Sequence, residues 1–208
     1  MKTKSNQIIL NNEQLAAVNA GIGTFAVIAG PGAGKTVCLV ERYNRLRQIT
    51  PVQEILSLTF TKTAAKEMRN RAEELSGNDS VGVAKPYGFV TFHSFCLSVV
   101  TAEHDQFGYS LAPFPLATEG QSAKIVGEVS RRFNLDFRTV KNWISLQKRN
   151  RIWGNQAVQN ADSTGLEQVY ALAYKEYEAK LRSLGLMDFD SLQMEVTHLL
   201  EQQPDIRQ

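Results

Sequence analysis

The stretch AGPGAGKT at residues 29–36 decides the fold that we expect for this chain. It fits the phosphate-binding pattern Gly-x-x-x-x-Gly-Lys-(Ser/Thr), with Gly34, Lys35 and Thr36 in register and Ala29 where the strict pattern has Gly. Backbone N–H groups of such a loop turn inward around a phosphate, and Gly30, Gly32 and Gly34 permit the positive φ angles and close backbone approach that this cradle requires. The residues expected to bind nucleotide here are Gly30, Gly32, Ala33, Gly34, Lys35 and Thr36. Lys35 is the expected catalytic residue, against the β and γ phosphates, and Thr36 is the expected Mg²⁺ ligand.

The residues on either side of the loop support this interpretation. TFAVIA (24–29) is a short apolar, β-branched run that predicts a strand, and VCLVERYNRLRQI (37–49) has apolar residues at helical spacing. The alternative is a glycine-rich turn that ends in Lys-Thr by chance. A strand, a glycine loop and a helix in this order favour the phosphate-binding loop.

Two further strand–helix pairs are predicted after the loop. EILSLTF (54–60) and GFVTF (88–92) have the pattern of buried strands, and TKTAAKEMRNRAEEL (61–75) and HSFCLSVV (93–100) that of helices, with a loop at 77–82. Three strands, each followed by a helix, predict an α/β fold with a parallel sheet and right-handed crossovers. Ligands of such sheets bind at the carboxyl ends of the strands, where polar motifs stand in this chain.

The pattern changes after residue 105. A turn-rich stretch at 108–121 precedes three segments with helical spacing, 121–134, 138–152 and 164–184, with no strand between them. These residues predict an all-α subdomain.

Composition describes an ordinary globular chain of 208 residues, with 43% hydrophobic and 21% charged residues and a net charge of +2. Neither a signal peptide nor a membrane-spanning run is expected, so a cytoplasmic location is expected. Charge is unevenly spread: residues 131–151 carry seven Lys or Arg against one Asp, while 188–205 carry five acids and no Lys or Arg. The basic run predicts nonspecific affinity for DNA phosphates, with a solvated surface as the alternative.

With these motifs, the chain resembles the N-terminal part of the UvrD, Rep and PcrA group of superfamily 1 DNA helicases. LNNEQLAAV (10–18) resembles the opening Q motif, so that Gln14 is expected to reach the adenine. The same residue also has capping-box spacing from Asn11, and the two roles are compatible. AGPGAGKT resembles motif I, in which Ala is usual at the first place.

Two other motifs are implied to line a path for single-stranded DNA. LTFTKTAAKEMRNR (58–71) resembles motif Ia and TFHSF (91–95) resembles motif Ib. The resemblance makes six residues DNA-facing: Phe60, Thr61, Lys62, Thr91, Phe92 and His93. Aromatic rings can stack on bases, and hydroxyl and ammonium groups can hold phosphates. A core position remains the alternative for Phe60 and Phe92, and His93 is given no catalytic role.

The helical region also carries family-like segments. ISLQKRNRI (144–152) resembles a segment with a Lys that is implied to contact DNA, here Lys148, and LGLMDFDSL (184–192) resembles the ALDFDDL stretch. Two departures stand out. Val37 occupies the place of an Arg that contacts the nucleotide base in relatives, and Arg42 cannot be assumed to replace it. Ser191 replaces an Asp, which is tolerable at an exposed helix start.

The resemblance implies an α/β fold, with a RecA-like P-loop parallel sheet, helices on both faces and an inserted all-α subdomain. Subdomain 1A is expected at 1–107, helical subdomain 1B at 108–183, and a return to 1A at 184–208, ending before motif II. LGLMD (184–188) is rejected as the strand that carries the motif II carboxylate, because it contains a Gly, lacks β-branched residues and precedes a helix start.

The implied function is the ATP- and single-stranded-DNA-binding part of an ATP-dependent helicase that acts at duplex junctions in repair, replication or recombination. It would use ATP and Mg²⁺ and move 3′ to 5′, and the part alone is expected to hydrolyse ATP negligibly. The alternatives are the helicase portion of an AddA- or RecB-like helicase-nuclease, and a non-catalytic nucleotide- and DNA-binding module. Protein partners are not implied.

Overall fold

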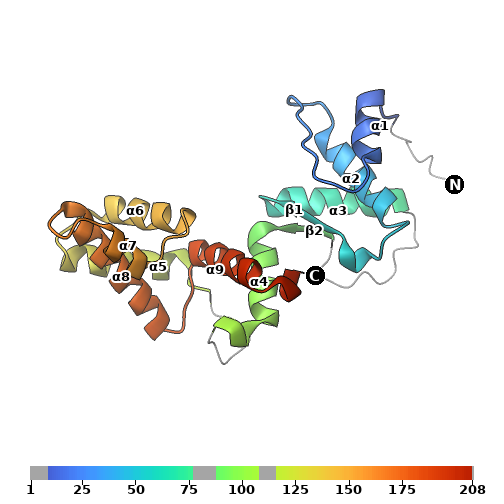
Figure 1. Cartoon of the computed structure of the whole chain (residues 1–208). Helices are drawn as coiled ribbons and strands as arrows, with labels where there is room; N and C mark the ends of the chain where they lie inside the picture. Colours follow the sequence, from blue (N-terminus) through green and yellow to red (C-terminus); the bar gives the residue numbers. More distant parts are fainter. Residues whose placement is uncertain (1–8, 77–87, 108–115, 208) are drawn as a thin grey trace. The chain divides into compact units, whose positions relative to one another are not determined.

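The computed structural model describes residues 9–76, 88–107 and 116–207. The chain forms two compact units, residues 1–95 and residues 96–208, and the division between them falls within helix α4. Each unit is described by itself, and Figure 1 gives the labels of the elements. The predicted loop at 77–82 and most of the turn-rich stretch at 108–121 lie outside the described residues.

The first unit contains the two strands of the structure. Its elements are α1 (Asn12–Asn19), α2 (Lys35–Leu46), the 3₁₀ turn η1 (Val52–Glu54), β1 (Leu56–Thr59), α3 (Lys62–Ser76), β2 (Gly88–Thr91) and the start of α4 (Phe92–Ala102). The predicted helix at 10–18, the second and third predicted strands and the helices after them are confirmed within one or two residues.

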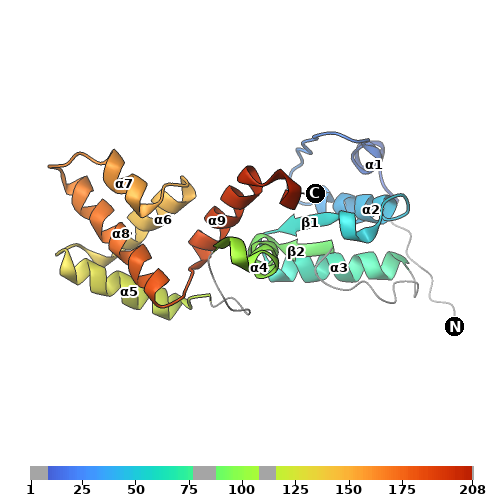
Figure 2. The same cartoon turned by 60° about the horizontal axis from the view of Figure 1, so that its bottom comes forward.

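The two strands form a parallel sheet. Leu56 pairs with Gly88 and Thr59 with Thr91, so both strands end at the same edge. Figure 2 shows α3 running along the sheet. Phe89 of β2 is 2% exposed, and its ring lies 4.7 Å from the ring of Tyr43 on α2, a contact worth about 0.5–1.5 kcal/mol beyond burial. Helix and sheet therefore share one apolar core.

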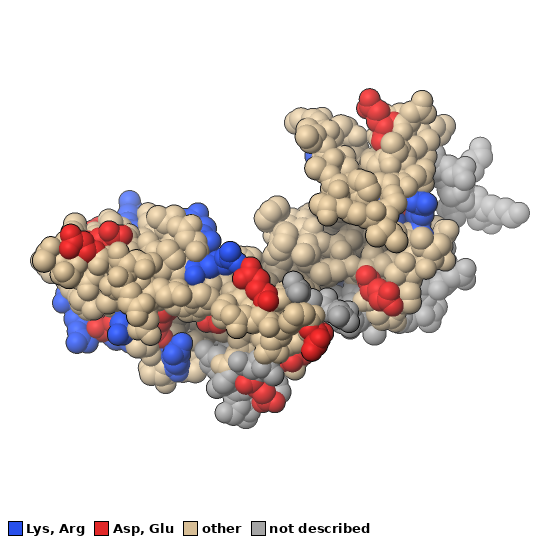
Figure 3. Space-filling model, in the orientation of Figure 1, with Lys and Arg blue, Asp and Glu red and all other residues tan. Residues whose placement is uncertain are grey.

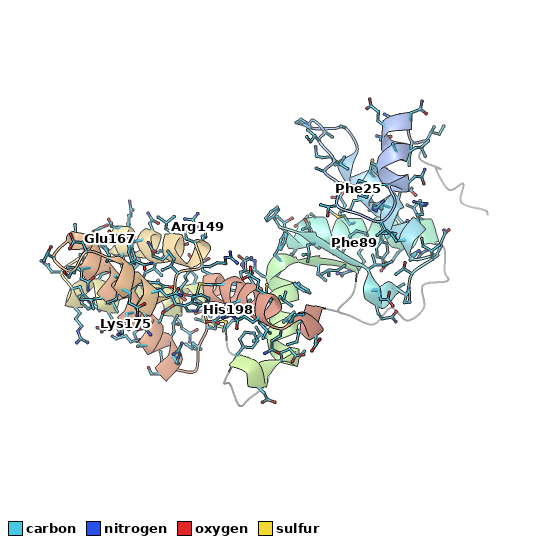
Figure 4. All side chains as sticks on the ribbon, viewed as in Figure 1. Phe25, Phe89, Arg149, Glu167, Lys175 and His198 are labelled. Carbon is cyan, nitrogen blue, oxygen red and sulfur yellow. The ribbon has the colours of Figure 1, made fainter. Side chains whose placement is uncertain are left out.

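The predicted first strand, TFAVIA at 24–29, is not a strand in this structure. The segment is irregular, and Phe25, Val27 and Ile28 are exposed by 56%, 57% and 97%. Figure 4 shows Phe25 on this segment and Phe89 on the sheet. A strand exists only where its backbone groups pair with a neighbour, and no described segment pairs with these residues. The β-branched composition favours extended backbone, but it does not supply a neighbouring strand.

The second unit is helical in its described part, apart from one isolated parallel bridge between Leu116 and Met187. After α4 come η3 (His104–Phe107), α5 (Glu119–Arg132), α6 (Phe137–Arg149), α7 (Gly154–Asn160), α8 (Leu166–Ser183), α9 (Phe189–Gln202) and η4 (Pro204–Arg207). The three predicted helices correspond to α5, α6 and α8. Their core contains Val129, Val140, Ala171 and Tyr174, all at most 1% exposed.

Short-range side-chain caps begin three of these helices. Thr118, Asp136 and Asp188 each accept a hydrogen bond from the backbone N–H three residues on, at 3.2, 2.8 and 2.8 Å. Such a cap is worth about 1 kcal/mol. Asp188 is therefore the N-cap of helix α9, as expected from the helix-start pattern after LGLMD. Met187, the residue before it, forms a single bridge and not a strand.

Helix α7 was not predicted, because it is only seven residues long and lacks an apolar stripe. It packs closely on α8: a Cβ atom at Gly154 would lie 2.7 Å from the Cα of Lys175. The described structure is thus mostly helical with a small parallel sheet, and none of its helices has the length and apolar character needed to cross a bilayer.

Candidate functional site

The loop at 29–36 leads directly into α2. Gly32 and Gly34 have φ angles of 76° and 81°, and Gly34 is the N-cap of α2. A side chain at either position would be strained. Of the three loop glycines expected to permit positive φ angles or close backbone approach, Gly32 and Gly34 have positive φ, and Gly30 does not. The loop therefore brings backbone N–H groups to the positive end of a helix, the usual arrangement for an anion site.

Lys35 folds back onto the loop. Its Nζ donates to the carbonyl oxygens of Ala29 at 2.8 Å and Gly30 at 2.6 Å. A phosphate group offers the ammonium stronger, charged acceptors than these carbonyls, so the side chain lies where it can transfer to a nucleotide.

Thr36 follows on the first turn of α2 and is half-buried. Its hydroxyl is of the type that, with phosphate oxygens, ligates Mg²⁺. The described ranges contain no group of three or more His, Cys, Asp or Glu side chains arranged to hold a metal. Thr36 remains the predicted ligand.

Gln14 connects α1 to this loop. Its Oε1 accepts from the N–H of Asn11 at 3.0 Å, which completes the predicted capping box, and its Nε2 donates to the carbonyl of Ala33 at 3.1 Å. A Cβ atom at Gly34 would lie 2.7 Å from this Nε2. The amide of Gln14 is thus packed against the phosphate loop, and its contact with adenine stays a prediction.

Apart from Lys148, the residues assigned to DNA lie at the carboxyl ends of the two strands. Phe60 follows β1 and Phe92 begins the helix after β2, and their ring centroids are 5.2 Å apart with an interplanar angle of 38°. Phe60 is 87% exposed, whereas Phe92 is half-buried. The core alternative for Phe60 is therefore wrong in this structure, and its ring is available to a base.

The polar residues beside these rings differ in exposure, and two of them cap helices. The hydroxyls of Thr61 and Thr91 each accept a backbone N–H three residues on, from Ala64 and Ser94, both at 3.1 Å. Thr91 is 6% exposed, so it caps the helix start rather than facing solvent. Lys62 is exposed and His93 is half-buried.

Lys148 does not lie where DNA can reach it. The residue is 2% exposed, and its Nζ donates to Asp188 Oδ2 at 2.5 Å and to Ser191 Oγ at 2.8 Å. Tyr177 donates its hydroxyl to the same Asp188 oxygen at 2.6 Å. We therefore correct its assignment: Lys148 is part of a buried network that joins α6, α8 and α9, and Ser191, rather than lying at an exposed helix start, is a member of it.

A family model of the UvrD/REP helicase N-terminal domain matches residues 10–208. The chain belongs to this family. It is similar to the ATP-dependent DNA helicase UvrD1 of Mycobacterium leprae, with 32% identity over 207 residues, 95% of this chain and 26% of the relative. It is also similar to the ATP-dependent DNA helicases PcrA of Staphylococcus epidermidis, 29% identical over 203 residues, and of Leuconostoc citreum, 31% identical over 204 residues. These two alignments cover 94% and 95% of this chain and 27% of each relative. The chain therefore spans about a quarter of the length of the curated relatives it matches.

Part of the basic run of this UvrD/REP-type chain is paired with carboxylates. Arg132 pairs with Glu176 at 2.8 Å, Lys141 with Glu119 at 3.5 Å, and Arg151 with Glu201. On the face drawn in Figure 3, Lys and Arg side chains are interspersed with Asp and Glu over α5–α8. The predicted phosphate-binding surface is therefore smaller than the seven basic residues of the sequence suggest.

One signal in the sequence pointed to the burial of Lys148. Val140, Ile144 and Lys148 are spaced by four residues on α6, and all three are buried. A Lys in line with apolar residues at this spacing lies on the packed face of its helix. The carboxylate partner, 40 residues away, has no such local signal.

Proposed function

We propose that this chain is the ATP- and single-stranded-DNA-binding N-terminal part of an ATP-dependent DNA helicase. The observation that carries the proposal is the phosphate loop, in which Gly32 and Gly34 have positive φ angles and Lys35 begins α2. The names of the relatives, ATP-dependent DNA helicases, support it.

The proposed roles follow from the positions of the residues. Lys35 leaves the carbonyls of Ala29 and Gly30 for the β and γ phosphates, and Thr36 ligates Mg²⁺. Gln14 contacts the adenine from its place beside the loop. At the sheet edge, Phe60 stacks on a base while Lys62 contacts a phosphate.

The finer parts of the proposal concern the whole protein. We infer a RecA-like sheet with subdomain 1A at 1–107 and 184–208, a helical subdomain 1B at 108–183, and 3′ to 5′ movement along cytoplasmic DNA in repair, replication or recombination. The alternative is that the chain is the helicase portion of an AddA- or RecB-like helicase-nuclease, which carries the same motifs. Mg²⁺-dependent cleavage of linear duplex DNA by the parent protein would favour that alternative.

Binding of both ligands tests the proposal directly. The chain is titrated with Mg-ATP by calorimetry and, separately, with a fluorescent oligonucleotide by anisotropy. Saturable binding of each is expected. Binding of nucleotide without DNA would leave only a nucleotide-binding module, and binding of neither would contradict the proposal.

Substitution of Phe60 by Ala is expected to weaken binding of single-stranded DNA by about 1–3 kcal/mol, because it removes one stacking surface. The melting temperature is expected to stay nearly unchanged, since Phe60 is 87% exposed. All four bases should be affected similarly, because each has a π face. Anisotropy with oligo-dT and oligo-dA measures the loss.

Phe137→Ala, on α6, is the matched control, because Phe137 is also a partly exposed phenylalanine. It should bind both oligonucleotides like the wild-type chain. If Phe60→Ala binds DNA as tightly as the wild type, Phe60 does not contact the DNA. If the variant unfolds, Phe60 contributes to the core and the exposed position is contradicted.

A further inference from the structure

Helix α1 is a short helix that depends on neighbours for its stability. It has eight residues, and isolated helices shorter than about 12–15 residues are marginal in water. Its last turn carries no basic residue of its own, and only Val18 is buried. The carbonyl groups at its carboxyl end therefore depend on donors from elsewhere in the chain.

Arg42 of α2 supplies most of these donors, and Nη1 of Arg45 adds a longer contact with the carbonyl of Val18 at 3.4 Å. Nη1 of Arg42 lies 2.6 Å from the carbonyl oxygen of Ala20, and its Nη2 lies 3.2 Å from that of Gly21. Two longer contacts of Arg42 Nη1 reach Val18 at 3.3 Å and Ala17 at 3.4 Å. A guanidinium group at this end of a helix also meets the negative end of the helix dipole.

The same α2 helix carries the phosphate loop at its start. Lys35 begins α2, and Arg42 lies seven residues further along it, about two turns. The other end of α1 meets the loop through the bond from Gln14 to Ala33. The amino end of α1 is thus hydrogen-bonded to the phosphate loop, and its carboxyl end is hydrogen-bonded to α2.

We propose that Arg42 is a positioning residue for nucleotide binding, which anchors α1 and thereby holds Gln14 against the phosphate loop, ready for the base of the nucleotide. The inference rests on the proposed function. It gives Arg42 a role other than that of the missing Arg at position 37, because its guanidinium donates to the carbonyls of Ala20, the C-cap of α1, and of Gly21, the next residue.

The experiment compares the wild-type chain with Arg42→Met, which keeps the apolar stem, and Arg42→Lys, which keeps the charge. Arg71→Met is the control: Arg71 lies on α3 of the same unit and pairs with Glu67 at 2.6 Å. Calorimetry measures the affinity for Mg-ATP and for inorganic tripolyphosphate, which lacks the base. Hydrogen–deuterium exchange measures the protection of the α1 amides.

Arg42→Met is expected to lower the affinity for Mg-ATP by about three- to tenfold, the worth of a lost hydrogen bond, without changing that for tripolyphosphate. Exchange of the α1 amides should accelerate in Arg42→Met and stay unchanged in Arg71→Met. Arg42→Lys should show a smaller effect on both exchange and Mg-ATP affinity. In a Gln14→Ala background, Arg42→Met should weaken Mg-ATP binding no further, because both changes remove the same contact.

Equal losses for the two ligands would mean that Arg42 supports the loop as a whole, which would overturn the route through Gln14. Unchanged α1 exchange in Arg42→Met would overturn the anchor itself. If the wild-type chain binds Mg-ATP and Arg42→Met binds it equally well, only the inference fails. If the wild-type chain binds neither ligand, the proposed function fails and the inference with it.

Discussion

Replacing Lys148 with Met lowers the free energy of unfolding of the 96–208 unit by about 3–5 kcal/mol, as expected when one partner of a buried ion pair is removed. Lys148 is 2% exposed and Asp188 is 8% exposed, so neither charge has much water around it. Without the ammonium, the hydroxyl of Tyr177 and the N–H of Ser191 are the partners of the carboxylate that remain among the described residues. Denaturant unfolding followed by circular dichroism measures the loss.

Two further variants separate charge from packing. Arg149→Met alters the adjacent residue, which is exposed on α6 (Figure 4) and whose Nε donates to the carbonyl of Ser145 at 3.3 Å. This substitution should cost little stability. Lys148→Met combined with Asp188→Asn should recover part of the lost stability, because an amide can still cap α9 but carries no buried charge. Similar losses from Lys148→Met and Arg149→Met would contradict the buried-pair account.

The pH dependence of the same variant provides a second measurement. Burial acts to raise the pKa of Asp188, but the Lys148 ammonium and the hydrogen bonds of Lys148, Tyr177 and Ser191 outweigh burial and hold this pKa below its ordinary value. The stability contributed by Asp188 is therefore present above an unfolded-state pKa of about 3.9, and it is lost as the pH falls through the lower folded-state pKa. In Lys148→Met, burial is less opposed, so the stability difference between variant and wild type should shrink in acid and grow towards neutral pH.

The second large effect concerns Lys35. Lys35→Ala is expected to weaken Mg-ATP binding by about tenfold to a hundredfold, because a charge-assisted bond to phosphate is worth about 1.5–3 kcal/mol. The melting temperature should change little, since Lys35 is exposed and its two bonds are to the carbonyls of Ala29 and Gly30. Calorimetric titration with Mg-ATP provides the affinity.

Lys66→Ala is the control for this substitution, because Lys66 is an exposed lysine on α3 of the same unit. It should bind Mg-ATP like the wild-type chain. Affinity for single-stranded oligonucleotide should be unchanged in both variants, since Phe60 and Phe92 are untouched. Equal Mg-ATP affinities of Lys35→Ala and the wild type would exclude the loop as the phosphate site.

Prediction from sequence succeeded where the interacting groups are close along the chain. The Asn11–Gln14 capping box, the helix start at Asp188 and the positive φ angles of Gly32 and Gly34 depend on residues at most three apart. It failed for the strand at 24–29, because strand formation needs a hydrogen-bonding partner. It also left the exposure of Phe60 undecided, because an apolar residue at a strand end occurs both in cores and on surfaces.

The sequence by itself determined the phosphate loop, the order of most helices and the two paired strands, because glycine backbone freedom, caps and apolar spacing are local properties. Only the tertiary structure decided that Lys148 is buried against Asp188, and that Arg42 binds the end of α1. These partners are 40 and 22 residues apart. The environment of a long charged side chain is set by the helices that pack around it, and a pattern within one helix does not specify which distant residues those helices bring.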